Sequence, residues 1–321
     1  MFAFLACSWD GYFVDFGCRR SGMSFGPPVI ETRVTTRHAP WWVIFHLGNV
    51  NTVKDQLRPG DGSQNQMAIG ISPHDHNLML LGTDLAGAYR TTDGGKNWFN
   101  NDQGLALLGT LGYGFDPVNP NIVYCVNQSI PGSMPFIPAN KFEGIYKSTD
   151  AGLTWKQVLN VKNIRKRQHD IRFDKSGAVY VLGQSGVFKS SDGGANWQNL
   201  GLADLTKQAL HVGANGEWLL TASEEQGIHY SADGGKTWQL RNQGLGEIKP
   251  YCYVTIHPQK PDTWFCVAGN KLYRSDDRGM NWVEQTGAIP GKQMCKLMFG
   301  AANPAGEPVL YLVYRAVGSP L

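Results

Sequence analysis

Residues 89–98, with the sequence YRTTDGGKNW, contain the pattern that decides the fold. Four further copies follow it: YKSTDAGLTW at 146–155, FKSSDGGANW at 188–197, HYSADGGKTW at 229–238 and YRSDDRGMNW at 273–282. The five aspartates are Asp93, Asp150, Asp192, Asp233 and Asp277, separated by 57, 42, 41 and 44 residues. A period of this length indicates that one supersecondary unit is repeated along the chain.

The residue types of the motif favour a locked hairpin. The aspartate and the preceding Ser or Thr can hydrogen-bond to the backbone of their own turn, and the glycine permits positive φ. The tryptophan is large enough to fill the space between neighbouring repeats. We interpret all five aspartates as structural, because five equivalent positions cannot form one active site.

Each motif is preceded by short strand-like segments. Residues 112–115 and 122–127 alternate or carry β-branched and aromatic residues, and Pro and Asn separate them. The same pattern of strand, turn and strand recurs at 253–269 and, in shorter form, at 170–183. A third strand leads into the motif and a fourth leaves from its tryptophan. The sequence therefore predicts an all-β chain, a β-propeller of four-stranded blades.

The motifs resemble the Asp-box, or bacterial neuraminidase repeat, over residues 67–282 and more weakly to 315. We expect six blades, or an incomplete seven-bladed propeller. Residues 296–317 supply two strands of a last blade, and the apolar run 41–53 is expected to complete it. The propeller is thus predicted over 41–321. Residues 1–40 lack the repeat and are predicted to form a poorly docked N-terminal extension.

Composition excludes several classes of function. The net charge of +3 is too small to indicate binding to nucleic acid, and no apolar run is long enough to span a membrane. The six cysteines show no CxxC spacing, so no metal is predicted, and no phosphate or dinucleotide motif indicates a cofactor. No clear signal peptide is evident.

Topology predicts where function should lie. In a four-stranded meander the turns between strands three and four, which hold the motifs, share one face with the turns between strands one and two. The loops between strands two and three converge on the other face, which we expect to be functional. There the insertion 127–143 carries Phe136 and Phe142, which either stack on a sugar ring or pack the loop. The link 160–170 brings Arg165, Arg167 and Asp170.

Residues 81–91, LGTDLAGAYRT, resemble the first-blade segment of glycoside hydrolase family 74, the xyloglucan-cleaving two-propeller enzymes. The resemblance implies that Asp84 is the catalytic base and that the protein acts on extracellular polysaccharide. Ala86 departs from the family pattern, and a structural Asx-turn at Asp84 stays open. In that family the acid comes from a second propeller. The candidates within this chain are Glu143, Asp170, Glu224 and Glu225.

Two other classes of Asp-box propeller were compared. Sialidases carry an Arg-Ile-Pro segment and an arginine triad, and this chain lacks the Arg-Ile-Pro segment. Non-catalytic Asp-box propellers, such as the photosystem II assembly propeller and sortilin-type receptor domains, bind protein on one face. Arg165 and Arg167 would suit that role. A protein-binding or assembly scaffold therefore stays open beside a carbohydrate-active propeller that hydrolyses or binds β-glucan or xyloglucan-type polysaccharide, with or without the second catalytic propeller.

Overall fold

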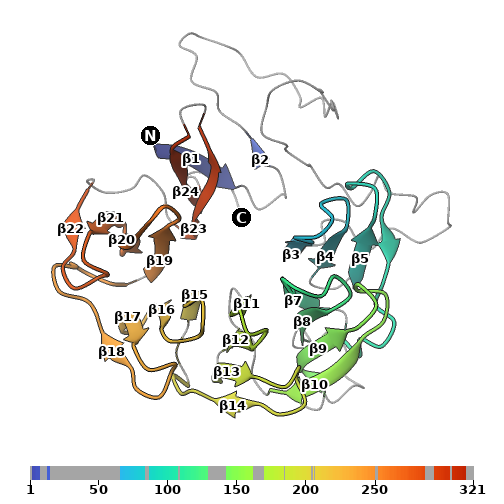
Figure 1. Cartoon of the computed structure of the whole chain (residues 1–321). Helices are drawn as coiled ribbons and strands as arrows, with labels where there is room; N and C mark the ends of the chain where they lie inside the picture. The colour runs from blue at the N-terminus through green and yellow to red at the C-terminus, as the bar shows by residue number, and fades with distance from the viewer. Residues whose placement is uncertain are drawn as a thin grey trace, which may run out of the picture.

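The computed structural model describes residues 2–7, 13–14, 66–83, 87–107, 109–128, 142–161, 170–183, 185–203, 205, 207–249, 252–285, 293–303 and 306–315. Within these ranges the elements are all β-strands, gathered in six four-stranded sheets. The predicted all-β propeller is confirmed: the sheets are arranged around a common centre (Figure 1). No helix in the described ranges is long and apolar enough to cross a membrane.

The sheets follow the order of the chain. The first contains β3 (Gln66–Ile71), β4 (Met79–Thr83), β5 (Ala88–Thr91) and β6 (Phe99–Asn100). The second contains β7 (Gly109–Phe115), β8 (Val123–Gln128), β9 (Gly144–Ser148) and β10 (Lys156–Asn160). The third contains β11 (Ile171–Phe173), β12 (Val179–Gly183), β13 (Gly186–Ser190) and β14 (Gln198–Asn199).

The fourth sheet contains β15 (Lys207–Val212), β16 (Leu219–Ser223), β17 (Gly227–Ser231) and β18 (Gln239–Leu240). The fifth contains β19 (Cys252–His257), β20 (Lys260–Ala268), β21 (Lys271–Ser275) and β22 (Val283–Glu284). The sixth contains β23 (Gln293–Ala302), β24 (Pro308–Arg315), β1 (Phe2–Cys7) and β2 (Phe13–Val14). In each sheet the first-named strand is innermost (Figure 1).

Five sheets are antiparallel meanders, and the sixth is closed differently. In it β1 pairs in parallel with β24, from Phe2 opposite Leu310 to Ala6 opposite Tyr314, and β2 pairs with β1. These two strands come from the segment 1–40. The run 41–53, which we expected in this position, lies outside the described residues. The domain boundary at residue 40 and the total number of blades remain predictions.

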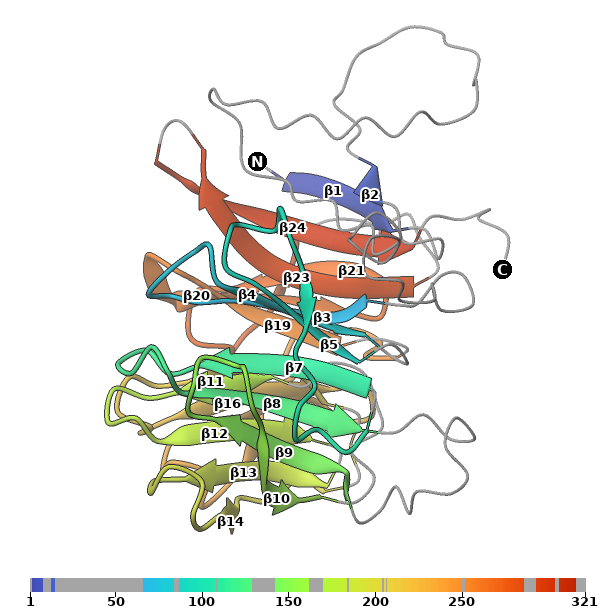
Figure 2. The same cartoon turned by 90° about the vertical axis from the view of Figure 1, so that its right-hand side faces the viewer.

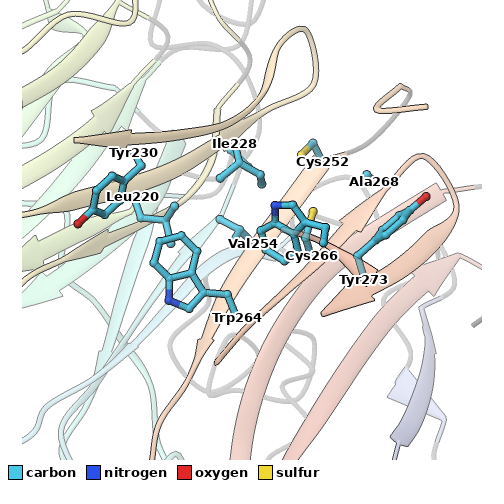
Figure 3. Packing of buried hydrophobic residues seen from close by; sticks show 11 residues of the cluster. Leu220, Ile228, Tyr230, Cys252, Val254, Trp264, Cys266, Ala268 and Tyr273 are labelled. Atoms are coloured by element: carbon cyan, nitrogen blue, oxygen red, sulfur yellow. The ribbon is translucent and has the colours of Figure 1, made fainter. Parts of the chain in front are cut away.

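The core lies between facing sheets rather than inside one sheet. Figure 3 shows such a junction, where Leu220 and Tyr230 of the fourth sheet pack against Val254 and Trp264 of the fifth. The rings of Tyr230 and Trp264 lie 5.8 Å apart. Cys266 is a free, fully buried thiol in the same cluster, and burial raises its pKa. Each blade is therefore stabilised chiefly by burying apolar surface against its neighbours.

Candidate functional site

The Asp-box turns occupy one end of the sheets. Those of the first, second and fourth sheets hydrogen-bond to the turn between the first two strands of their own sheet, as the Gly94 amide does to the Asn77 carbonyl at 3.1 Å. The Gly234 amide makes the same bond to Glu217, also at 3.1 Å. The side view shows turns on two opposite sides of the stacked sheets (Figure 2). The loops between second and third strands therefore lie on the face opposite the Asp boxes.

The Asp-box carboxylates are bonded within their own turns. In the fourth sheet, Asp233 Oδ1 accepts hydrogen bonds from the Ser231 hydroxyl at 2.8 Å and the Thr237 amide at 2.9 Å. Its Oδ2 accepts one from the Thr237 hydroxyl at 2.7 Å. The other four boxes repeat this pattern. A carboxylate engaged in this way holds a hairpin closed and has little capacity left for a ligand.

These bonds make the hairpins sensitive to acid. Bonds from Thr237 lower the pKa of Asp233, and bonds from Asn196 lower that of Asp192, each from 3.8 to about 2. At Asp93 and Asp277 burial acts in the opposite direction, but similar hydrogen bonds outweigh it and the pKa is again about 2. A carboxyl group whose pKa falls on folding stabilises the folded state above its unfolded pKa, and this contribution is lost as the pH falls toward the folded pKa.

We therefore expect the free energy of unfolding to fall steeply as the pH is lowered from about 4 to about 2. Urea unfolding midpoints measured between pH 6 and pH 2.5 would show it. An Asp233→Ala variant should be less stable at pH 6 and show a smaller loss on acidification. Lys236→Ala, in the same turn, serves as the control. Equal acid sensitivity of wild type and Asp233→Ala would contradict the assignment.

Sequence reasoning missed that the indoles of Trp155, Trp238 and Trp282 hydrogen-bond to the preceding blade, whereas those of Trp98 and Trp197 donate within their own turns. The Trp155 amide and indole donate to the carbonyls of Gln103 and Asn101, which follow the first sheet, both at 2.9 Å. Trp282 repeats both bonds to Gln243 and Arg241, at 2.9 and 2.8 Å. The signal was present in the sequence as the repeated Gln-Gly-Leu at 103–105 and 243–245.

On the opposite face, the β4–β5 loop carries the segment with the family-74 resemblance. Thr83 ends β4, and both its amide and its hydroxyl donate to the Gly87 carbonyl, at 3.2 and 2.9 Å. The loop is thus closed at its base by a residue with no exposed surface. Asp84, the candidate base, lies outside the described residues, between these two anchors.

Two of the predicted site residues, Glu143 and Phe142, lie just before β9 of the second sheet. Glu143 is only 2% exposed. Its carbonyl accepts hydrogen bonds from the side chains of Gln157 and Asn160, both at 3.2 Å. Phe142 is half-buried, and its carbonyl accepts the Tyr146 hydroxyl at 2.8 Å. Phe136 lies outside the described residues. Glu143 and Phe142 thus anchor the end of the insertion to the sheet.

Asp170 directly precedes β11, the innermost strand of the third sheet (Figure 1). Its Oδ2 accepts the Leu210 amide of the fourth sheet at 2.8 Å, and its Oδ1 lies 3.1 Å from Arg172 Nη2. Arg172 in turn donates to the Leu210 carbonyl at 3.0 Å. The carboxylate therefore joins the innermost strands of two sheets. Arg165 and Arg167, predicted on the preceding link, lie outside the described residues.

The β16–β17 turn presents the two remaining candidate acids, Glu224 and Glu225. Glu224 is half-buried and Glu225 is exposed. At the base of the turn, Ser223 Oγ lies 3.0 Å from His229 Nε2 and accepts the Gln226 amide at 3.0 Å. Ser223 and His229 are 0% and 3% exposed, so this pair shapes the turn beneath the glutamates rather than meeting a ligand.

The described part of this face therefore presents a rim of loops whose acidic side chains differ in solvent exposure and in hydrogen bonding. Glu143 is enclosed and Asp170 is bonded between strands, whereas Glu225 reaches solvent. In the described ranges no three His, Cys, Asp or Glu side chains gather as metal ligands would. The rim can offer hydrogen-bond acceptors and acid–base groups to a polar ligand.

Comparison with known proteins fits this architecture. Residues 272–286 match the BNR-Asp box repeat and residues 229–240 match the BNR/Asp-box repeat. Together with the four-stranded sheets around a common centre, they define the chain as an Asp-box β-propeller.

Its curated relatives include photosystem II assembly lipoproteins, xyloglucanases and VPS10 domain-containing receptors. The chain is 25% identical to the photosystem II assembly lipoprotein Ycf48 of Nostoc sp. over 214 residues, 62% of this chain and 54% of the relative. It is 22% identical to a xyloglucanase of Paenibacillus sp. over 264 residues, 74% of this chain and 24% of the relative. It thus spans about half the length of the first and about a quarter of the second.

A solved structure titled "YCF48 bound to D1 peptide" has a similar fold. It superposes with a TM-score of 0.52 at 14% identity, covering 75% of this chain and 74% of that one. At this identity the likeness concerns the fold alone.

Proposed function

We propose that the protein is a carbohydrate-active propeller that binds or hydrolyses β-glucan of the xyloglucan type on the face opposite its Asp boxes. The observation that carries the proposal is the xyloglucanase similarity over 264 residues, which accompanies the GTDLAGAYR segment at 82–90. The hydrogen bond between the Thr83 hydroxyl and the Gly87 carbonyl supports it, because these two residues flank the segment that contains Asp84 at the end of the first sheet.

Hydrolysis with inversion needs two carboxyl groups roughly 6.5–9.5 Å apart, with room for a water molecule between the base and the sugar. Among the candidate acids, Glu143 is enclosed, and Asp170 bonds to the Leu210 amide and to Arg172. Glu224 and Glu225 fit the role of proton donor better, because their turn lies on the rim. A second domain is the other source of the acid. Phe136 and Phe142 are the proposed sugar-stacking residues.

Replacing Asp84 with alanine is expected to reduce xyloglucan hydrolysis at least about 100-fold while leaving affinity for the polysaccharide nearly unchanged, because a general base contributes to the transition state. Reducing-sugar release and isothermal titration with xyloglucan oligosaccharides measure the two effects. Asp75→Ala, an exposed aspartate on the Asp-box side, is the matched control.

Equal hydrolysis by wild type and Asp84→Ala would remove Asp84 from the mechanism, and failure of the wild type to bind any β-glucan would remove the proposal. A protein-binding scaffold is the second candidate, favoured by the similarity to Ycf48. This function predicts that the protein neither binds nor hydrolyses glycans. It also predicts that a protein partner is captured in a pull-down and that charge reversal of Arg165 and Arg167 abolishes the capture.

A further inference from the structure

The innermost strand of each sheet turns alternate side chains toward the preceding and the following sheet. Two glycines fix the direction. A Cβ added at Gly70 would lie 2.7 Å from Tyr113 of the second sheet, and one at Gly114 would overlap Ile171 of the third. Gly70 and Gly114 therefore face forward. Side chains alternate along a strand, so their neighbours Ile69 and Ile71, like Tyr113 and Phe115, face the preceding sheet.

In the later sheets this backward face is covered. The register of strand pairing identifies the residues equivalent to Ile69 in the other five sheets. They are Tyr113, Ile171, Leu210, Val254 and Leu297. Four of these equivalents are deeply buried: Ile171 is 3% exposed, Leu210 0%, Val254 1% and Leu297 5%. Tyr113 is also packed, in the cluster that contains Leu80 of the first sheet.

The first sheet breaks the pattern. Ile69 is 49% exposed and Ile71 is 53% exposed. Across the junction, Phe299 of β23 packs backward on Phe265 of the fifth sheet, with ring centroids 5.7 Å apart. Its neighbour Met298 therefore faces forward, and it is 39% exposed. The first and sixth sheets are neighbours in the ring (Figure 1), so exposed apolar side chains line both sides of their junction.

We propose that this junction, defined by Ile69, Ile71 and Met298, is the docking surface for residues 41–53 of the same chain. The part of the chain outside the structure between β2 and β3 runs from residue 15 to 65, so it starts from the sixth sheet and ends at the first. Its 51 residues fall within the range of the Asp-box separations, 41 to 57 residues. It begins and ends on the two sheets that flank the exposed surface.

The composition of this segment matches the surface. Residues 41–45 read WWVIF, an apolar run with the aromatic and β-branched residues favoured in buried strands. Residues 54–65 separate the run from β3, and a chain of that length can extend about 40 Å, at roughly 3.3–3.6 Å per residue. Apolar side chains exposed in a row are stabilised by burial, and this segment supplies apolar partners at high effective concentration.

Photo-crosslinking tests the occupant directly. The full chain is prepared with p-benzoylphenylalanine in place of Ile71, irradiated at micromolar concentration and analysed by peptide mass spectrometry. We expect an intramolecular crosslink to a peptide within residues 41–53. The matched control carries the same group in place of Val118, which is 73% exposed in the turn between β7 and β8, and should give no such crosslink.

A crosslink between two copies would assign the surface to self-association, and a crosslink elsewhere in the chain, or none, would also overturn the proposal. Hydrogen exchange supplies an independent measurement. Ile71→Asp should speed amide exchange within 41–53 at least about tenfold while the Asp-box hairpins stay protected. Unchanged exchange in that segment would contradict docking even if the variant folds normally. Neither experiment depends on glycan binding.

Discussion

The free energy of unfolding of a Trp155→Ala variant is expected to be about 3–5 kcal/mol lower than that of the wild type. This is the usual cost of deleting a large buried aromatic side chain. Trp155 is 5% exposed and packs with Leu80 of the first sheet and Val123, Cys125 and Tyr146 of the second. Its indole also donates to the Asn101 carbonyl at 2.9 Å. The substitution therefore removes packing and a hydrogen bond between two blades at once.

Two further variants separate these contributions. Trp155→Phe keeps much of the ring but loses the indole donor, so we expect a smaller loss of about 1–2 kcal/mol. Phe99→Ala removes an aromatic side chain that is 58% exposed on the outermost strand, and its effect should stay within about 1 kcal/mol. Urea denaturation followed by fluorescence measures all three. A similar effect for Trp155→Ala and Phe99→Ala would show that the tryptophan does not hold the blades together.

The second large effect is expected at Gly104, in the link between the first two blades. Its φ is +91°, and an alanine Cβ there would overlap the carbonyl oxygen of Trp155. Backbone atoms cannot move aside without opening the junction, so we expect Gly104→Ala to cost about 3 kcal/mol or more. The equivalent Gly244 meets the Trp282 carbonyl in the same way and should behave alike.

Gly177 provides the matched control for backbone strain. Its φ is +82°, but no atom lies within 4 Å of an added Cβ. Gly177→Ala should therefore cost only the strain of the left-handed conformation, about 1–2 kcal/mol. The difference between Gly104→Ala and Gly177→Ala in the free energy of unfolding then measures the steric clash. If the two variants lose the same stability, the close approach at Gly104 is not important.

The candidate site could be located from the sequence only in outline. The Asp-box spacing predicts which loops share the opposite face, because alternate connections of an antiparallel meander lie at opposite ends. The sequence does not predict that Glu143 is enclosed or that Asp170 joins two sheets. The Leu210 amide that bonds to Asp170 lies 40 residues away along the chain, and Gln157, which bonds to the Glu143 carbonyl, lies 14 residues away. Long-range partners of this kind leave no local pattern.

The sequence alone determined the class of fold, because each Asp box specifies its own hairpin through bonds spanning only two to four residues. Local side-chain chemistry and a regular spacing suffice for that. Tertiary structure alone decided how the blades meet: that Trp155 docks on Asn101, and that β1 and β2 join the sixth sheet. These outcomes depend on the burial of apolar surface between distant segments, which is non-directional and is settled only when the sheets assemble.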